Sequence, residues 1–102
     1  MRQFDVYENP SAEARRFAPY VVVVSSHLIV GFDDAVVAPL VNDSAVVVPG
    51  LELPVTFDDQ RLVVVLTELA GIQGRSLKRR VGSLLAHEDD IRRALDRLFT
   101  GF

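Results

Sequence analysis

Apolar residues run through the first half of the sequence in short stretches that favour β-strands. Residues 4–7 alternate weakly between apolar and polar side chains, and three stretches rich in β-branched residues follow at 20–24, 35–41 and 45–48. Side chains of this kind are stiff and pack well on a pleated sheet. Because these runs are almost unbroken, we expect both faces of the strands to be covered, by a curled sheet or by a partner subunit.

The following third of the sequence predicts a hairpin and a further crossing segment. Pro49-Gly50 indicates a turn, residues 53–57 a short strand, and residues 58–61 the connection into a strand over 62–69. Residues 71–74 are predicted to form a loop, and residues 75–85 either another strand or an irregular crossing. Neighbouring strands joined in this way predict a mostly antiparallel sheet.

A helix is predicted over residues 88–99. Its apolar residues recur at the spacing of one helical face, at Ile91, Ala94, Leu95 and Leu98. Three acidic residues, 88–90, occupy the first turn, where they suit the helix dipole. Gly101 is expected to end the helix.

These elements predict a mainly β fold, a small twisted antiparallel sheet or partial barrel with a C-terminal α-helix. The 102 residues show no repeat or linker, so we expect a single domain over residues 1–102. Nearly half of the residues, 49%, are hydrophobic, which is high for so small a chain. We therefore expect a homodimer with a two-fold interface.

Charge and composition narrow the classes of partner. The net charge of −3 argues against binding nucleic acid through a general electrostatic footprint, so no direct nucleic-acid binding is expected and a protein target is favoured. No apolar run approaches the ~18 residues of a membrane span, and no signal peptide is recognised. With no cysteine in the chain, a reducing, cytoplasmic setting is the expectation.

Candidate chemistry is sparse. His27 and His87 do not have a metal-ligand spacing, so no metal or cofactor is expected, and His87 is placed at or next to the start of the helix. Three pairs of aspartates, 33–34, 58–59 and 89–90, are interpreted as turn or helix-start residues. A basic cluster, Arg75, Lys78, Arg79 and Arg80, indicates a solvated edge or a contact with an acidic partner protein or a second subunit.

The end of the sequence carries a family resemblance. Residues 81–85, Val-Gly-Ser-Leu-Leu, then Ile91, then residues 94–102, Ala-Leu-Asp-Arg-Leu-Phe-Thr-Gly-Phe, resemble the C-terminal signature of the CcdB family of bacterial toxins. Segments 3–7, 20–29, 36–40, 54–55 and 62–66 are similar to that family in the same order. The resemblance implies an SH3-like β-barrel with a C-terminal helix, the fold shared by CcdB-like and MazF-like toxins.

The function implied by the resemblance is that of a non-enzymatic toxin. Such a toxin binds the A subunit of DNA gyrase, traps the enzyme with its DNA cut, and is neutralised by a CcdA-like antitoxin, with which it represses its own promoter. Matched position by position, the residues that would contact gyrase are Leu28, Ile29, Asp96, Phe99, Thr100, Gly101 and Phe102. The chain differs from the family pattern at Ser25, His27, Thr100 and Phe102.

Three alternatives remain open on the sequence. One is a MazF-like endoribonuclease, whose acid–base and cationic groups could come only from Arg15, Arg16 and His27. Another is a decayed toxin that binds antitoxin without poisoning its target, because Thr100 cannot stack as an indole does. The third concerns the tip alone: Phe99 and Phe102 could fold back onto the core as a hydrophobic helix cap.

Overall fold

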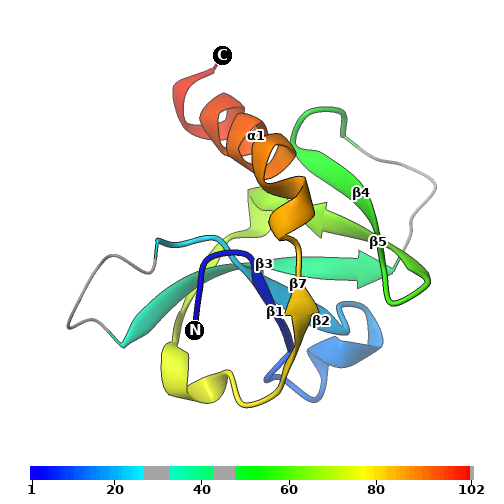
Figure 1. Ribbon diagram of the computed structural model, residues 1–102, viewed down its shortest axis with the longest axis vertical. Helices are drawn as coiled ribbons and strands as arrows, with labels where there is room; N and C mark the ends of the chain where they lie inside the picture. Colours follow the sequence, from blue (N-terminus) through cyan, green and yellow to red (C-terminus); the bar gives the residue numbers. More distant parts are fainter. Residues whose placement is uncertain (27–32, 43–47, 102) are drawn as a thin grey trace.

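The computed structural model describes residues 1–26, 33–42 and 48–101 (Figure 1). In these parts of the chain a strongly curled sheet precedes one α-helix. The elements are β1 (Asp5–Glu8), β2 (Tyr20–Val23), β3 (Asp34–Asn42), β4 (Glu52–Phe57), β5 (Gln60–Val65), β6 (Ala70–Gln73), β7 (Arg80–Ser83) and α1 (Glu88–Thr100). Short 3-10 turns lie at Ala14–Arg16, Leu66–Glu68, Gly74–Ser76 and Leu85–His87. The predicted fold class, a mainly β partial barrel with a C-terminal helix, is confirmed.

Strand β3 organises the sheet. Every described pairing is antiparallel, in the order β4-β5-β3-β2-β1-β7, with β6 paired to β3 outside this path. On the side away from β2, residues 40–42 of β3 pair with β5 and residues 34–37 pair with β6. The long β3 therefore holds two short strands one after the other along a single edge.

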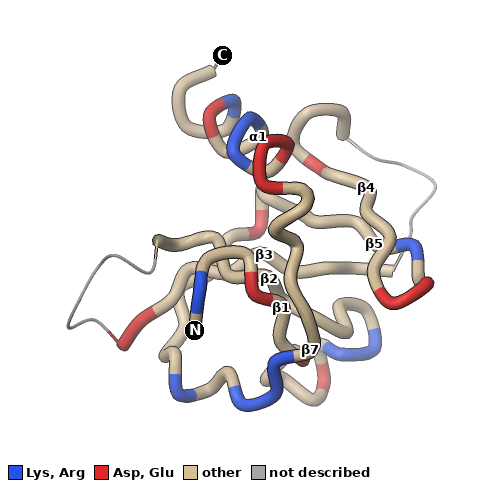
Figure 2. The backbone as a smooth tube through the Cα atoms, viewed as in Figure 1, with Lys and Arg blue, Asp and Glu red and all other residues tan. Residues whose placement is uncertain are grey.

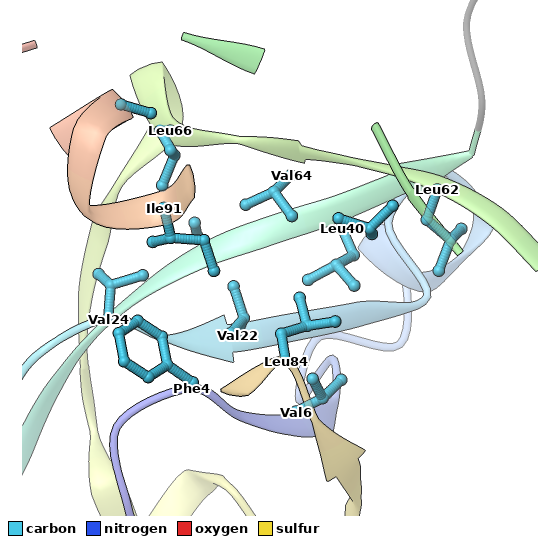
Figure 3. Packing of buried hydrophobic residues seen from close by; sticks show 13 residues of the cluster. Phe4, Val6, Val22, Val24, Leu40, Leu62, Val64, Leu66, Leu84 and Ile91 are labelled. Carbon is cyan, nitrogen blue, oxygen red and sulfur yellow. The ribbon is translucent and has the colours of Figure 1, made fainter. Parts of the chain in front are cut away.

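Both faces of the sheet carry a core, and β2 shows why its apolar run is unbroken. Val22 points into the larger cluster, while Val21 and Val23 point into a smaller one with Tyr7, Ala35 and Val37. The larger cluster includes Phe4, Leu40, Leu62, Leu66, Leu84 and Ile91 (Figure 3). The sequence left two explanations open for the covering of both faces, and the curled sheet supplies it within one chain.

The two outer strands of the sheet meet through side chains. Phe57 of β4 packs against Gly82 of β7, where a Cβ atom on the glycine would lie only 2.7 Å from the phenylalanine ring. The same ring meets Tyr20 edge to face, with centroids 5.4 Å apart. Glycine at position 82 thus leaves room for the ring that closes the curled sheet.

Two predictions for the middle of the chain are wrong. The strand expected over residues 62–69 ends at Val65, because the Leu66–Glu68 turn carries the chain along the edge of β3 and buries Leu66 beneath the helix. The loop expected over 71–74 is instead β6, whose backbone hydrogen-bonds to β3 despite its poor strand propensity. Tertiary pairing overrides local propensity here.

Of the remaining predictions for this region, one is wrong in its bounds, one is resolved by the structure and one lies mostly outside the described residues. The hairpin connection is shorter than the four residues expected, because Asp58 and Asp59 alone form the turn, at φ 52° and 60°, and β5 already begins at Gln60. Positive φ at both central residues is typical of the two-residue turns that connect the strands of a β-hairpin. Residues 75–85 prove to be an irregular crossing that ends in β7. The strand expected over 45–48 falls mostly on 45–47, outside the described residues.

Candidate functional site

Helix α1 is fixed to the sheet by its first two turns. Ile91 and Ala94 are buried in the larger core, and Leu95 packs against that core from its margin. Figure 3 shows Ile91 pointing toward Val24 and Leu66, beneath the helix. The apolar face predicted from the spacing of these residues is therefore real, and its contacts hold the helix in one orientation.

Polar contacts anchor the helix at two further points. Arg97 donates from Nη1 to the carbonyl oxygen of Gly50 at 3.2 Å, and a Cβ on Gly50 would lie 2.6 Å from that nitrogen. Gln3 donates to the carbonyl oxygen of Val24 at 3.0 Å and accepts from Arg92 at 3.4 Å. The Gln3 side chain thus links the end of β2 to the helix.

The last turn of α1 carries an exposed aromatic ring. Phe99 is 71% exposed, although it follows the partly buried Leu98 on the helix. The alternative in which Phe99 folds back onto the core as a helix cap is therefore wrong. The fully buried residues of the helix, Ile91 and Ala94, lie in its first two turns, and Phe99 lies more than one turn beyond them.

The residues beside Phe99 form a small surface, which we call the tip: Asp96, Phe99, Thr100 and Gly101. Asp96, Phe99 and Thr100 are all exposed and share one side of the helix, because they are three and four positions apart. The Thr100 hydroxyl donates to the Asp96 carbonyl oxygen, and Gly101 ends the helix at φ 77° with its N–H on the Arg97 carbonyl at 3.0 Å. The predicted helix end at Gly101 is confirmed.

The structure brings together four of the seven predicted contact residues. Leu28, Ile29 and Phe102 lie outside the described residues, as does His27. The positioning pair Gln3 and Arg92 was missed by sequence reasoning, and no local signal could have found it, because the two residues are 89 positions apart.

A cluster of charged residues lies where the end of β1 meets the start of β7 and the Ala14–Arg16 turn. Glu8 bridges Arg15 at 3.5 Å and Arg79 at 3.7 Å, and Arg15 also donates to the Asn9 carbonyl at 2.6 Å. These residues line a hollow of about 400 Å³ together with Pro10, Ser76 and Lys78. The basic cluster predicted as an edge is therefore joined by Arg15 from the 3-10 turn at Ala14–Arg16.

Of the two histidines, His87 lies among the described residues. His87 is the N-cap residue of α1, which agrees with its predicted place, and its side chain makes no capping hydrogen bond.

Among the described residues, no three acidic or histidine side chains gather in a way that could hold a metal ion. In the same part of the chain, no helix is both long and apolar enough to cross a membrane.

Comparison with known proteins identifies the family to which the chain belongs. The sequence model of the CcdB family, described as CcdB protein, matches residues 3–101, nearly the whole chain. The chain belongs to the CcdB family. Its membership makes it a toxin of the toxin–antitoxin kind, as the resemblance of its C-terminal segment implied.

The fold of this chain is similar to that of another toxin of known structure. The Mycobacterium tuberculosis toxin MazF-mt6 superposes with a TM-score of 0.71 and 21% sequence identity, covering 97% of each chain. An identity this low supports the shared fold and leaves the activity open. No curated protein matches the chain.

Proposed function

We propose that this CcdB-family chain binds the A subunit of DNA gyrase through the tip of α1 and traps the enzyme with its DNA cleaved. In this proposal the chain is not itself an enzyme, and a CcdA-like antitoxin neutralises it. A homodimer would present two tips related by a two-fold axis to a target of the same symmetry. The proposed contact residues are Leu28, Ile29, Asp96, Phe99, Thr100, Gly101 and Phe102.

One observation supports this most strongly: Phe99 stays exposed on a helix whose other apolar side chains are buried or partly buried. Aromatic side chains, including Phe, are enriched in protein interfaces, where their large apolar area contributes strongly to binding. The core contacts of Ile91 and Ala94 and the Arg97–Gly50 hydrogen bond fix the helix before the target arrives. Little ordering cost then remains for binding.

A MazF-like ribonuclease is the second candidate, favoured by the fold that the chain shares with MazF-mt6. Of the groups that the sequence offered for such chemistry, Arg15 is held by Glu8 and Asn9, and His27 lies outside the described residues. The place that most nearly meets the need is Glu8 between Arg15 and Arg79, a carboxylate beside two guanidinium groups. A ribonuclease has no use for the exposed Phe99.

The test is a cleavage assay with gyrase from the native host, supercoiled DNA and ATP. The intact protein is compared with a version that lacks residues 100–102. Because α1 is held by residues further back along the helix, we expect the shortened protein to keep its fold, which circular dichroism checks.

Linear DNA that appears only with the intact protein supports the proposal. If neither protein yields linear DNA while labelled RNA is degraded, the ribonuclease is the better account. If neither substrate is cut although the protein binds antitoxin, the chain is a decayed toxin, as the substitution at Thr100 allows.

A further inference from the structure

Positive charge gathers at the end of the molecule opposite the tip. Two segments far apart in sequence contribute to this surface, which we call the basic end: Arg15, Arg16, Arg75, Lys78, Arg79 and Arg80. Glu8 joins the two segments, since it bridges both Arg15 and Arg79. Figure 2 shows these residues as an arc of blue along the end of the molecule away from the C-terminus.

The net charge of the whole chain, −3, does not show this local excess of positive charge. The basic end has six cations, and four acidic residues lie in contact with its segments or beside them: Asp5, Glu8, Glu13 and Asp33. Asp33 belongs to this set because its carbonyl oxygen accepts from the N–H of Gly74, next to Arg75. Elsewhere the sequence has ten acidic residues against five basic ones. The side chains of Arg16 and Lys78 form no ion pair within the described residues. Positive charge is therefore left over for a partner.

The chemistry of the basic end favours a polyanion over a folded protein. Its hollow of about 400 Å³ is lined by charged and polar side chains, with Pro10 as the single apolar member. Protein interfaces usually combine arginine with buried aromatic anchors, and this lining has arginines but no aromatic side chain. Five of the six cations are arginines, whose planar forks match the oxygens of phosphate groups.

We propose that the basic end binds the phosphate backbone of double-stranded DNA without reading its sequence. The arc of cations suits a linear polyanion, and contacts to backbone phosphates carry no sequence information. Glu8 forms ion pairs with both Arg15 and Arg79, which fixes the two segments of the arc relative to each other. Because the basic end and the tip lie at opposite ends, one molecule can use both surfaces at once (Figure 2).

This proposal replaces the expectation drawn from the net charge. A net charge of −3 predicts repulsion at long range, but binding at short range depends on the local charge within a Debye length of about 8–10 Å. The binding is therefore expected to be weak at physiological salt and strong at low salt.

The test measures fluorescence anisotropy of a labelled 30-bp duplex of arbitrary sequence with the purified protein, between 50 and 200 mM NaCl. If about four cations contact phosphates, the dissociation constant rises roughly 150-fold over this range. Lys78→Gln/Arg79→Gln removes two of them and is expected to weaken binding at 50 mM salt roughly tenfold or more, with a shallower salt dependence. The matched control, Arg61→Gln/Arg93→Gln, changes the net charge equally outside the basic end and is expected to bind like the unaltered protein.

Three results would overturn the proposal. They are the absence of binding at 50 mM salt, equal weakening by the control variant, and displacement of the duplex by polyglutamate at an equal concentration of charge. The last result would indicate an acidic protein partner. The assay contains no gyrase, so this proposal and the proposed function can fail separately.

Discussion

Gly101 adopts a backbone conformation that most residues disfavour. Its φ of 77° lies in the left-handed region, which costs a residue with a Cβ roughly 1–2 kcal/mol, whereas asparagine tolerates it better. A Cβ at this position would meet no atom within 4 Å, so the constraint comes from the backbone alone. Substitutions at position 101 can therefore test the effect of a side-chain charge separately from the effect of losing the helix cap.

Gly101→Glu is expected to abolish growth arrest, because it brings an unpaired charge into the proposed gyrase contact. Gly101→Asn, which keeps the left-handed cap without a charge, is expected to retain most of the activity. Growth after induction measures both variants, with thermal unfolding as the check on folding. Equal activity of Gly101→Glu and the unaltered protein would show that the tip does not enter the contact.

Individual residues also show the limit of what the sequence could tell. The choice between an exposed and a folded-back Phe99 needed the structure, because an apolar residue in the last turn of a helix is compatible with either arrangement. The meeting of Arg15 and Arg79 was equally hidden, since 64 positions separate them and only the β1–β7 pairing brings them together. The roles of Leu28, Ile29 and Phe102 stay predictions.

Helix α1 divides into a part that belongs to the core and a part that does not. Ile91→Ala is expected to lower the free energy of unfolding by about 2–5 kcal/mol, because Ile91 is fully buried. Phe99→Ala is expected to change it by no more than about 0.5 kcal/mol, because the ring is exposed. Urea denaturation measures both. A large loss of stability in Phe99→Ala would mean that the ring serves the fold.

The closure of the sheet between β4 and β7 depends on the absence of a side chain at Gly82. Gly82→Ala places a methyl group against the Phe57 ring and is expected to cost about 1–3 kcal/mol. Combined with Phe57→Leu, whose smaller side chain makes room, the loss should be smaller than the two single losses added together. Additive losses in this double-mutant cycle would contradict the contact.

Elements with a clear side-chain pattern were predictable, and elements without one were not. The helix follows from apolar spacing, because burial on one face sets that spacing. Strands β2 and β3 follow from nearly unbroken runs of β-branched residues, because both of their faces are covered. Strand β6 contains Gly71 and lies on an edge, so nothing in its own side chains marks it as a strand. Its existence depends on β3, which offers free backbone groups beside it.

At the scale of the whole molecule, the unused apolar surface supports the proposed homodimer. Outside the tip, the apolar side chains of Met1, Val36, Val48 and Leu85 are exposed. Sedimentation at micromolar concentration is expected to give twice the 11.3 kDa of one chain, with thermal stability that rises with protein concentration. Sedimentation as a monomer would remove the two-fold arrangement of tips from the proposed function.

Phe99 and Phe17 provide the most direct test of the central claim. Both are exposed phenylalanines, at 71% and 74%, but only Phe99 lies on the tip. Each is replaced by alanine, and each protein is added to host gyrase with supercoiled DNA and ATP, with linear DNA as the readout. The account predicts that Phe99→Ala loses most of the cleavage while Phe17→Ala matches the unaltered protein. Full cleavage with Phe99→Ala, or equal loss with both variants, would contradict it.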